Sequence, residues 1–444
     1  MMNTKYTWFA VVLSVATFMA TAQDQNPPRQ GADWSRFRGP NGQGSSPDTT
    51  PPTVWSDSQN LKWRTVLPAP GTSSPILVGQ KIFVTAWTNV ISSSGLQRHL
   101  ICLDQKTGSI LWNKTIKAQG SADRYEQFLQ DHGFASHTPV SDGERVYVYF
   151  GKGGALAFDL DGKELWHISL GTEANAKNWG SASSPIVHKD LVIINASEES
   201  HRVYALDKKT GKEIWKAEGA ALAYAFGTPV ISEQGGQRDL LLSLPNELWA
   251  MNPDTGKLKW FAQTGLPGNI SPSVVVGDGV AYAFGGFPRL GAMAVTLGGK
   301  GDVTQSNIVW TSNNSTYVPT PVLHEGRIYF ASDAGFATCL DAKTGALIFR
   351  ERLSGASASG RGGKSFYASS VLANGHVYAT SRRNGTFVFA AQPEFKLVAQ
   401  NKLADDDTDF NATPALAGRQ LFLRSNRALY CFETVQPAGE LKGQ

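Results

Sequence analysis

The sequence predicts an all-β protein, an eight-bladed β-propeller of four-stranded antiparallel blades. Three observations predict it. A unit of similar length recurs along the 444 residues, a strand-turn-tryptophan element recurs within that unit, and one tryptophan strand stands alone ahead of the first unit. Repeats of about 40–50 residues that hold four short strands are typical of propeller blades.

The recurring unit begins with a short apolar strand, usually after a proline, and continues with a turn and a strand rich in Val, Tyr and Phe. Period-2 alternation, as in Arg-Val-Tyr-Val-Tyr-Phe at 145–150, indicates strands. Successive units start 43 to 64 residues apart, and the first is longest because it holds insertions at 87–98 and 118–136. The starting residues are Pro75, Pro139, Pro185, Pro229, Pro272, Pro321, Ser370 and Pro414.

The element at 205–215, Ala-Leu-Asp-Lys-Lys-Thr-Gly-Lys-Glu-Ile-Trp, reads as two strands joined by a tight turn. Asp207 can accept hydrogen bonds from the backbone ahead of it, and Gly211 can take a positive φ. Trp215 is large and flat with one N–H to satisfy, which suits a docking position between two packed sheets. The equivalent residues are Trp112, Trp166, Trp260 and Trp310, with Phe349 and Val398 as weaker substitutes.

The eighth unit ends without a tryptophan strand, whereas residues 61–67 (Leu-Lys-Trp-Arg-Thr-Val-Leu) form such a strand with no turn before it. Trp63 lies 12 residues before Pro75, as Trp260 lies 12 residues before Pro272. We expect this N-terminal strand to complete the last blade and close the ring, which leaves no open edge between the first and last blades.

Four segments are expected along the chain. Residues 1–22 are predicted to be a cleaved secretory signal peptide, with Lys5, an apolar run at 8–19 and Ala-Thr-Ala at 20–22. Residues 23–60 are predicted to be an extended arm that Trp34 and Phe37 hold against the surface of the main domain. The propeller is expected over 61–435 and a C-terminal tail over 436–444.

These features predict a periplasmic or secreted protein without a transmembrane anchor in the mature chain. No cysteine follows the predicted cut, so a lipid anchor there is not expected, and the apolar run is short for a membrane span. We expect a monomer. The formal net charge of +4 gives no reason to expect nucleic acid as a partner.

The three cysteines, Cys102, Cys339 and Cys431, occupy the repeat position that Ala205 fills. An exported protein could use them in disulfides. A shared repeat position favours small buried residues on strands instead, because free cysteine behaves as a small hydrophobe.

The pattern Ala-Leu-Asp-x-x-Thr-Gly-Lys-x-x-Trp recurs at 102–112, 205–215 and 250–260, and in degenerate form at 339–349. It resembles the repeat of pyrroloquinoline quinone (PQQ) type propellers, a superfamily that includes quinoprotein alcohol dehydrogenases and the outer-membrane assembly factor BamB. Segments 34–44 and 424–431 look most like those of exported bacterial PQQ-like repeat proteins.

The resemblance implies two different functions. Quinoprotein dehydrogenases hold the quinone on the propeller axis and typically use a calcium ion, a catalytic Asp and a disulfide between adjacent cysteines. This sequence has no adjacent cysteine pair. No catalytic residue and no metal ligand is therefore assigned by resemblance.

The connections from each outer strand to the next blade's inner strand are expected to reach the central funnel, and they are rich in aromatic and amide side chains. A ring of flat faces with amides between them could hold a planar ligand, a sugar or a peptide. The alternative is that these side chains pack the axial channel. The candidates are Trp179, Tyr224, Phe226, Asn269, Tyr317, Arg361, Tyr367 and Asn411.

Three polar segments are weaker candidates. The insertion at 123–137 could supply metal ligands or an acid–base pair from Glu126, Asp131, His132 and His137, although its spacing matches no zinc signature. The loop at 353–367, with Arg361 and Lys364, could meet an anionic ligand, and the acidic run at 405–409 could bind calcium. Solvated loops are the favoured interpretation of all three.

No nucleophile elbow, P-loop, dinucleotide fingerprint, HExxH or CxxCH motif occurs in the sequence. The favoured hypothesis is an exported non-catalytic propeller that acts as a binding or scaffolding platform for a protein, peptide or carbohydrate ligand, with no cofactor assigned. The alternative is a PQQ-dependent (quinoprotein) dehydrogenase that oxidises an alcohol or sugar in the periplasm, with PQQ and calcium as cofactors. Fold alone does not distinguish the two.

Overall fold

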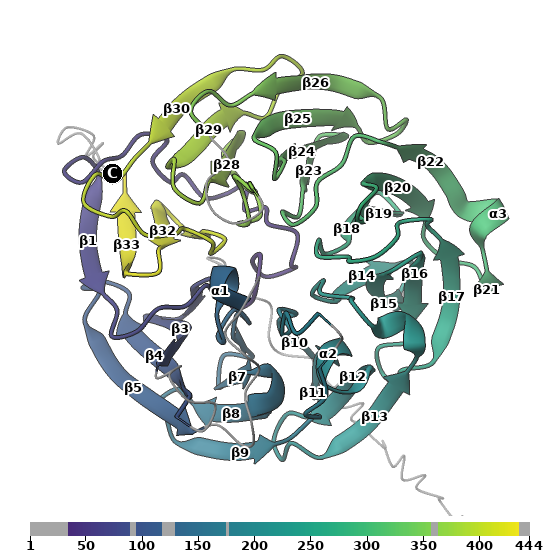
Figure 1. Cartoon of the computed structure of the whole chain (residues 1–444), viewed down its shortest axis with the longest axis horizontal. Helices are drawn as coiled ribbons and strands as arrows, with labels where there is room; N and C mark the ends of the chain where they lie inside the picture. Colours follow the sequence, from purple (N-terminus) through teal and green to yellow (C-terminus); the bar gives the residue numbers. More distant parts are fainter. Residues whose placement is uncertain (1–33, 89–94, 118–128, 175–176, 357–362, 435–444) are drawn as a thin grey trace, which may run out of the picture. The chain divides into compact units, whose positions relative to one another are not determined.

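A computed structural model describes residues 34–88, 95–117, 129–174, 177–356 and 363–434. Eight antiparallel sheets lie around a central axis, which confirms the predicted eight-bladed β-propeller (Figure 1). Helix in these residues is limited to single turns, α1 (Leu129–His132), α2 (Ser197–Ser200), α3 (Thr304–Asn307) and two 3-10 turns. None of the described helices is long and apolar enough to span a membrane.

Each blade runs from an inner strand near the axis to an outer strand at the circumference. Blade 1 consists of β2 (Ile76–Val78), β3 (Lys81–Thr88), β4 (Gln97–Asp104) and β5 (Ile110–Lys117), and blade 2 of β6 (Val140–Ser141), β7 (Arg145–Tyr149), β8 (Ala155–Asp159) and β9 (Glu164–Ile168). Blade 3 consists of β10 (Ile186–His188), β11 (Leu191–Ala196), β12 (Arg202–Asp207) and β13 (Glu213–Glu218), and blade 4 of β14 (Val230–Gln234), β15 (Gln237–Leu244), β16 (Glu247–Met251) and β17 (Leu258–Gln263).

Blade 4 carries one added short strand, β21 (Gly301–Asp302), which pairs in parallel with β17. Blade 5 consists of β18 (Val275–Gly277), β19 (Val280–Gly285), β20 (Gly291–Thr296) and β22 (Ile308–Ser312), and blade 6 of β23 (Val322–His324), β24 (Arg327–Ala331), β25 (Phe336–Asp341) and β26 (Leu347–Arg352). Blade 7 consists of β27 (Val371–Ala373), β28 (His376–Thr380), β29 (Thr386–Ala390) and β30 (Leu397–Asn401), and blade 8 of β31 (Ala415–Ala417), β32 (Gln420–Arg424), β33 (Ala428–Glu433) and β1 (Leu61–Val66).

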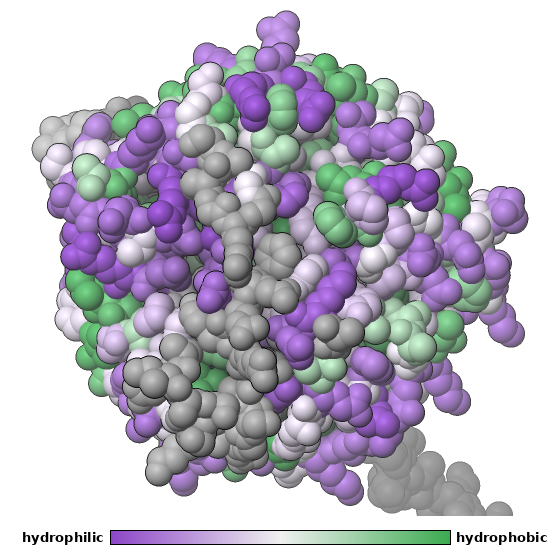
Figure 2. Space-filling model, in the orientation of Figure 1, coloured by the Kyte–Doolittle hydropathy of each residue, from purple (hydrophilic) through white to green (hydrophobic). Residues whose placement is uncertain are grey.

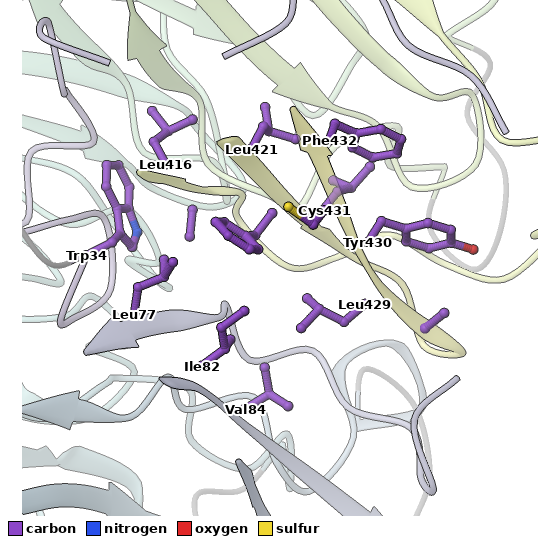
Figure 3. Close-up of a cluster of buried hydrophobic side chains, with 14 of the residues drawn as sticks. Trp34, Leu77, Ile82, Val84, Leu416, Leu421, Leu429, Tyr430, Cys431 and Phe432 are labelled. Atoms are coloured by element: carbon purple, nitrogen blue, oxygen red, sulfur yellow. The ribbon is translucent and has the colours of Figure 1, made fainter. Parts of the chain in front are cut away.

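The last blade contains strands from both ends of the described chain. β1 pairs antiparallel with β33 as the outer strand of the sheet β1-β33-β32-β31, which is the pairing that the sequence predicts for Trp63. Ile82 and Val84 of β3 face the side chains of β32 and β33 in one buried cluster (Figure 3). The core is therefore continuous between blade 8 and blade 1.

Trp215 shows how neighbouring blades contact each other. Its indole N–H donates to the carbonyl of Pro253, 3.1 Å away in the β16–β17 turn of the next blade. A Cβ on Gly256 (φ +69°) would lie 2.3 Å from the Trp215 ring, so glycine at this turn lets the ring approach closely. The same donor contact recurs from Trp63, Trp112, Trp166 and Trp310 to the carbonyls of Gln105, Leu160, Lys208 and Ala342.

Trp260 departs from this pattern. Its indole N–H donates to Asp239 of β15 in its own blade, 3.1 Å away. In blade 5, the segment with β21 and α3 stands between β20 and β22, in place of the short turn that receives the other tryptophans. The Trp260 ring nevertheless shares one buried cluster with Ala281, Met293 and Val295 of blade 5, so it packs between two blades as predicted and only its N–H contact differs.

Two sequence-based positions are also corrected. Val398 was predicted as a tryptophan substitute, but it is 36% exposed, and Ala399 is the residue paired with Val388 where Trp215 pairs with Ala205. The start of the fifth unit was placed at Pro272, yet β18 begins at Val275. The other inner strands begin one residue after the predicted start, so Val274 takes that position.

The N-terminal arm lies across the inner strands. The carbonyls of Trp34 and Ser35 accept backbone N–H groups from Leu77 of blade 1 and Ser141 of blade 2. Trp34 is only 1% exposed and belongs to the cluster in Figure 3. The arm therefore enters the core, whereas the sequence predicted that Trp34 would hold it against the surface.

Arg38 links the arm to blades 6 and 7. Its fully buried guanidinium donates to five backbone carbonyls, two in the arm itself and three in blades 6 and 7. The acceptors are Gly42 and Gln43 in the arm and Thr320, Pro321 and Ser370 in the blades. Backbone pairing of Gly44 and Ser46 with Leu372 then ties the arm to blade 7.

The cysteines are buried and unpaired, as the sequence predicted. Burial raises the pKa of the Cys102, Cys339 and Cys431 thiols to about 12, so they stay protonated at neutral pH. The predicted signal peptide and the C-terminal tail lie outside the described residues.

Candidate functional site

A cavity of about 190 Å³ lies on the axis of the propeller. Five of the eight predicted residues line it: Trp179, Phe226, Tyr317, Tyr367 and Asn411. Phe37 of the arm also lines it, together with small and hydroxyl side chains from the start of each blade. Tyr224 and Asn269 lie behind this lining, and Arg361 lies outside the described residues.

A ring of Ser and Thr residues surrounds the cavity, and we call it the hydroxyl collar. Its members precede the inner strands at equivalent positions, so the residue before each repeat start was the overlooked signal. In six members, the hydroxyl accepts the backbone N–H of the preceding blade's member at 2.9–3.0 Å, which links neighbouring blades. The collar is Ser74, Thr138, Ser184, Thr228, Ser273, Thr320, Ser369 and Thr413.

The aromatic side chains at the mouth of the cavity are held by polar contacts. Lys177 Nζ lies 4.5 Å from the centre of the Trp179 ring and 4.8 Å from that of Tyr224, close enough for cation–π attraction. The same ammonium donates to Asn269 Oδ1 at 3.0 Å, and Asn269 Nδ2 donates to the Tyr317 hydroxyl at 2.9 Å. Tyr224 and Asn269 therefore position Lys177 and Tyr317.

Three carboxylates near the mouth are paired with cations. Arg382 Nη2 donates to Asp131 at 2.9 Å and to Asp409 at 2.8 Å, and its guanidinium lies over the Tyr367 ring. Lys364 forms an ion pair with Asp333. The loop residue Lys364 and the acidic-run residue Asp409 therefore have partners within the protein and are not the solvated side chains that the sequence predicted.

The residues of the 123–137 insertion do not gather as a metal site. His132 Nε2 donates to the carbonyl of Trp179 at 2.8 Å, whereas His137 Nε2 contacts Ser181 Oγ at 2.9 Å. Glu126 lies outside the described residues. Within the described ranges, no three His, Cys, Asp or Glu side chains are grouped to hold a metal ion.

The described residues also do not fit the calcium and quinone that the resemblance implies. Asp131, Asp333 and Asp409 near the mouth each form an ion pair with a cationic side chain of the protein, which disfavours their sharing in a calcium site. In the described part of the lining, no Lys or Arg is present to pair with quinone carboxylates.

A second polar cluster lies under one side of the cavity. The Ser181 hydroxyl donates to Glu199 Oε1 at 2.6 Å, and the Tyr149 hydroxyl donates to Glu199 Oε2 at 2.7 Å. His137 and Glu199 both contact Ser181, so the histidine is not held between the acid and the serine as in a catalytic triad. Burial lowers the pKa of His137 to about 3, so its imidazole is neutral at physiological pH.

This burial predicts a pH dependence of stability. The unfolded chain protonates His137 below about pH 6.5, whereas the folded protein does so only near pH 3. Stability should therefore fall as pH falls through this window, by up to about 1.4 kcal/mol for each pH unit. Urea unfolding of wild type and His137→Gln between pH 7 and pH 4 measures the effect, and the variant should lose less stability.

The matched control is His376→Gln, because His376 is partly exposed on β28. Its acid dependence should follow that of the wild type. If His137→Gln and the wild type lose stability in parallel, protonation of His137 does not contribute to acid unfolding.

The chain is similar to known proteins in sequence and in structure. The family model described as outer membrane protein assembly factor BamB matches residues 53–282 and 300–394. BamB of Yersinia pestis is 24% identical over 236 residues, covering 48% of this chain and 56% of that protein. BamB of Burkholderia pseudomallei (strain K96243) is 24% identical over 206 residues, covering 46% of this chain and 45% of that protein. The chain thus spans about half the length of these curated relatives.

Solved structures show the same fold at low identity. BamB from Moraxella catarrhalis has a TM-score of 0.59 at 13% identity, covering 86% of this chain and 99% of that chain. A europium-containing methanol dehydrogenase has a TM-score of 0.61 at 12% identity, covering 92% and 99%. Quinohemoprotein alcohol dehydrogenase from Comamonas testosteroni has a TM-score of 0.60 at 14% identity, covering 93% and 82%.

Proposed function

Because the chain belongs to the family of outer membrane protein assembly factor BamB, we propose that it is a non-catalytic propeller that binds a protein partner in the periplasm. One observation supports the absence of catalysis. Several described polar groups around the cavity support the fold: Asp131, Asp333 and Asp409 near the mouth pair with cations, and six collar hydroxyls accept backbone N–H groups. The Ser181 hydroxyl does lie beside Glu199 and His137, but Ser181 is buried and does not line the axial cavity.

The mouth of the cavity is the proposed contact surface. Trp179, Tyr224 and Phe226 are partly exposed there, and Trp179 and Phe226 stack at 6.4 Å. Aromatic side chains often supply most of the energy of a protein interface. On the face in Figure 2, visible hydrophilic residues predominate and hydrophobic residues form separate patches, which is usual for protein surfaces.

The relatives' name suggests the chemistry of the partner. We propose that the mouth binds an extended segment of an outer-membrane protein, whose strands alternate apolar and polar side chains. Such a segment presents aromatic and aliphatic side chains to stack on Trp179 and Phe226.

The second candidate is a PQQ-dependent dehydrogenase. It is favoured by the similarity in fold to methanol and alcohol dehydrogenases. The uncharged lining of the cavity and the paired carboxylates near its mouth oppose it.

Trp179→Ala tests the proposed contact surface. We expect it to weaken binding of a labelled peptide with an outer-membrane strand pattern by about 30-fold, because interface aromatics of this kind contribute about 2 kcal/mol or more. Fluorescence anisotropy measures the affinity. The control, Ile214→Ala, removes an exposed aliphatic side chain at the circumference and should bind as the wild type does.

Equal peptide binding by Trp179→Ala and the wild type would exclude the mouth as the contact surface. Binding of PQQ with Ca²⁺, accompanied by dye-linked oxidation of an alcohol, would instead establish the dehydrogenase.

A further inference from the structure

The axial cavity is closed on the side opposite its mouth. In each repeat, the residues that lie at the mouth come first in the sequence, the collar residue follows them, and the inner strand begins after the collar residue. The arm bonds to residues at or after the collar, such as Leu77, Ser141 and Leu372, so it lies beyond the collar from the mouth. Phe37 of the arm lines the cavity. The arm therefore lies across the floor of the cavity, and a ligand is expected to enter from the mouth.

The collar offers hydrogen-bond donors to this pocket. In Thr138, Ser184, Thr228, Thr320, Ser369 and Thr413, the hydroxyl oxygen already accepts a backbone N–H. None of these six hydroxyls donates to another group in the described part of the chain. Each therefore has one O–H proton for a ligand or for water.

Two buried atoms add hydrogen-bond acceptors. His132 Nε2 faces the Trp179 carbonyl and so carries the proton, which leaves Nδ1 as an acceptor with no partner among the described residues. Asn411 Nδ2 donates to the carbonyl of Asp131 at 2.7 Å, and its Oδ1 is likewise buried without a partner in the described ranges. Both residues line the cavity. Both atoms are almost fully enclosed, so a ligand pairs with them when the two side chains turn toward the cavity. An unpaired buried polar atom costs about 1–3 kcal/mol, which favours such a turn.

The lining carries no formal charge. Among the described residues, none of those that line the cavity is Asp, Glu, Lys or Arg. His132 is neutral at physiological pH because burial lowers its pKa. A charged ligand would lose its hydration without gaining an ionic partner from this lining.

From this arrangement we propose that the axial cavity binds one uncharged sugar ring. A sugar ring presents apolar C–H faces to aromatic rings such as Trp179 and Tyr367. Its oxygens accept from the collar hydroxyls, and its hydroxyl groups donate to His132 Nδ1 and Asn411 Oδ1. The site extends the proposed function, because the protein partner contacts the mouth and the sugar occupies the pocket beneath it.

Saturation-transfer NMR on the full chain, followed by calorimetric titration, tests the proposal. The probes are glucose, galactose, mannose and N-acetylglucosamine, with glucuronic acid and glucosamine as charged analogues. At least one neutral sugar should bind with 1:1 stoichiometry, and the corresponding charged analogue should bind at least about tenfold more weakly. If the cavity holds water only, no neutral sugar will show saturation transfer, and the proposal is wrong.

Variants assign the binding to the cavity. Asn411→Leu should weaken sugar binding by about tenfold, because the variant lacks one hydrogen-bond acceptor. Asn113→Leu, on the exposed part of β5, is the matched control and should bind normally. Thr228→Val should weaken binding, whereas Thr228→Ser keeps the hydroxyl and should restore it.

Thermal unfolding of each variant separates lost binding from lost fold. Sugar binding that is equal in Asn411→Leu and Asn113→Leu would place the sugar elsewhere and overturn the proposal. The proposed protein partner is tested independently: peptide binding that depends on Trp179, without any sugar binding, would exclude the sugar site alone.

Discussion

Trp215→Ala is expected to lower the free energy of unfolding by about 3–5 kcal/mol, the usual cost of removing a buried tryptophan. The ring is only 8% exposed and lies against the turn of the next blade at Gly256. Its loss leaves a cavity between two blades and an unpaired carbonyl at Pro253. Urea unfolding followed by circular dichroism measures the change.

The neighbouring residue supplies the control. Ile214 is 52% exposed on the same strand, so Ile214→Ala should change stability by no more than about 0.5 kcal/mol. Trp215→Phe should fall between the two, because it keeps apolar area but loses the N–H donor. If Trp215→Ala were no worse than Ile214→Ala, the tryptophan contact would not hold these blades together.

Arg38→Met is expected to destabilise the protein by about 3–5 kcal/mol, because methionine replaces the aliphatic part of the side chain but has none of its donors. Five backbone carbonyls would lose their partner inside the core. Burial lowers the pKa of Arg38 to about 9, and the carbonyls compensate for the desolvation of its charge. Thermal unfolding and the rate of protease cleavage within 34–60 measure the effect.

Arg238→Met is the matched control. The Arg238 side chain is 41% exposed in its ion pair with Glu233, and such pairs contribute less than about 1 kcal/mol. Only Arg38→Met should speed cleavage of the arm. An Arg38→Met protein with wild-type stability and an equally protected arm would contradict the role assigned to this residue.

The errors of the sequence analysis share a cause. The repeat predicted that Trp260 contacts the next blade as the other tryptophans do and that Val398 replaces a tryptophan, yet each depends on the neighbouring residues. The α3 segment replaces the turn that would accept the Trp260 N–H. The turn between β29 and β30 is one residue longer than the turn between β12 and β13, which makes Ala399 the paired residue. A repeat indicates which positions are equivalent, but packing decides what each one contacts.

The candidate site was predicted in part. Aromatic and amide residues before each inner strand were expected at the funnel, and five of the eight line the cavity. The hydroxyl collar was missed although a Ser or Thr recurs before every inner strand, because no local pattern shows that its hydroxyls bond to the preceding blade. The pairing of Arg382 with Asp131 joins residues 251 positions apart and has no local signal.

By itself, the sequence determined the repeat, the number of blades, the turn glycines and the strand that completes the last blade. These depend on local chemistry: alternation, turn residues and the spacing of tryptophans. Only the tertiary structure decided the path of the arm, the closed floor of the cavity and its uncharged lining. Arg38 contacts carbonyls 282 to 332 residues away, and such contacts form only when the ring brings its blades together around one axis.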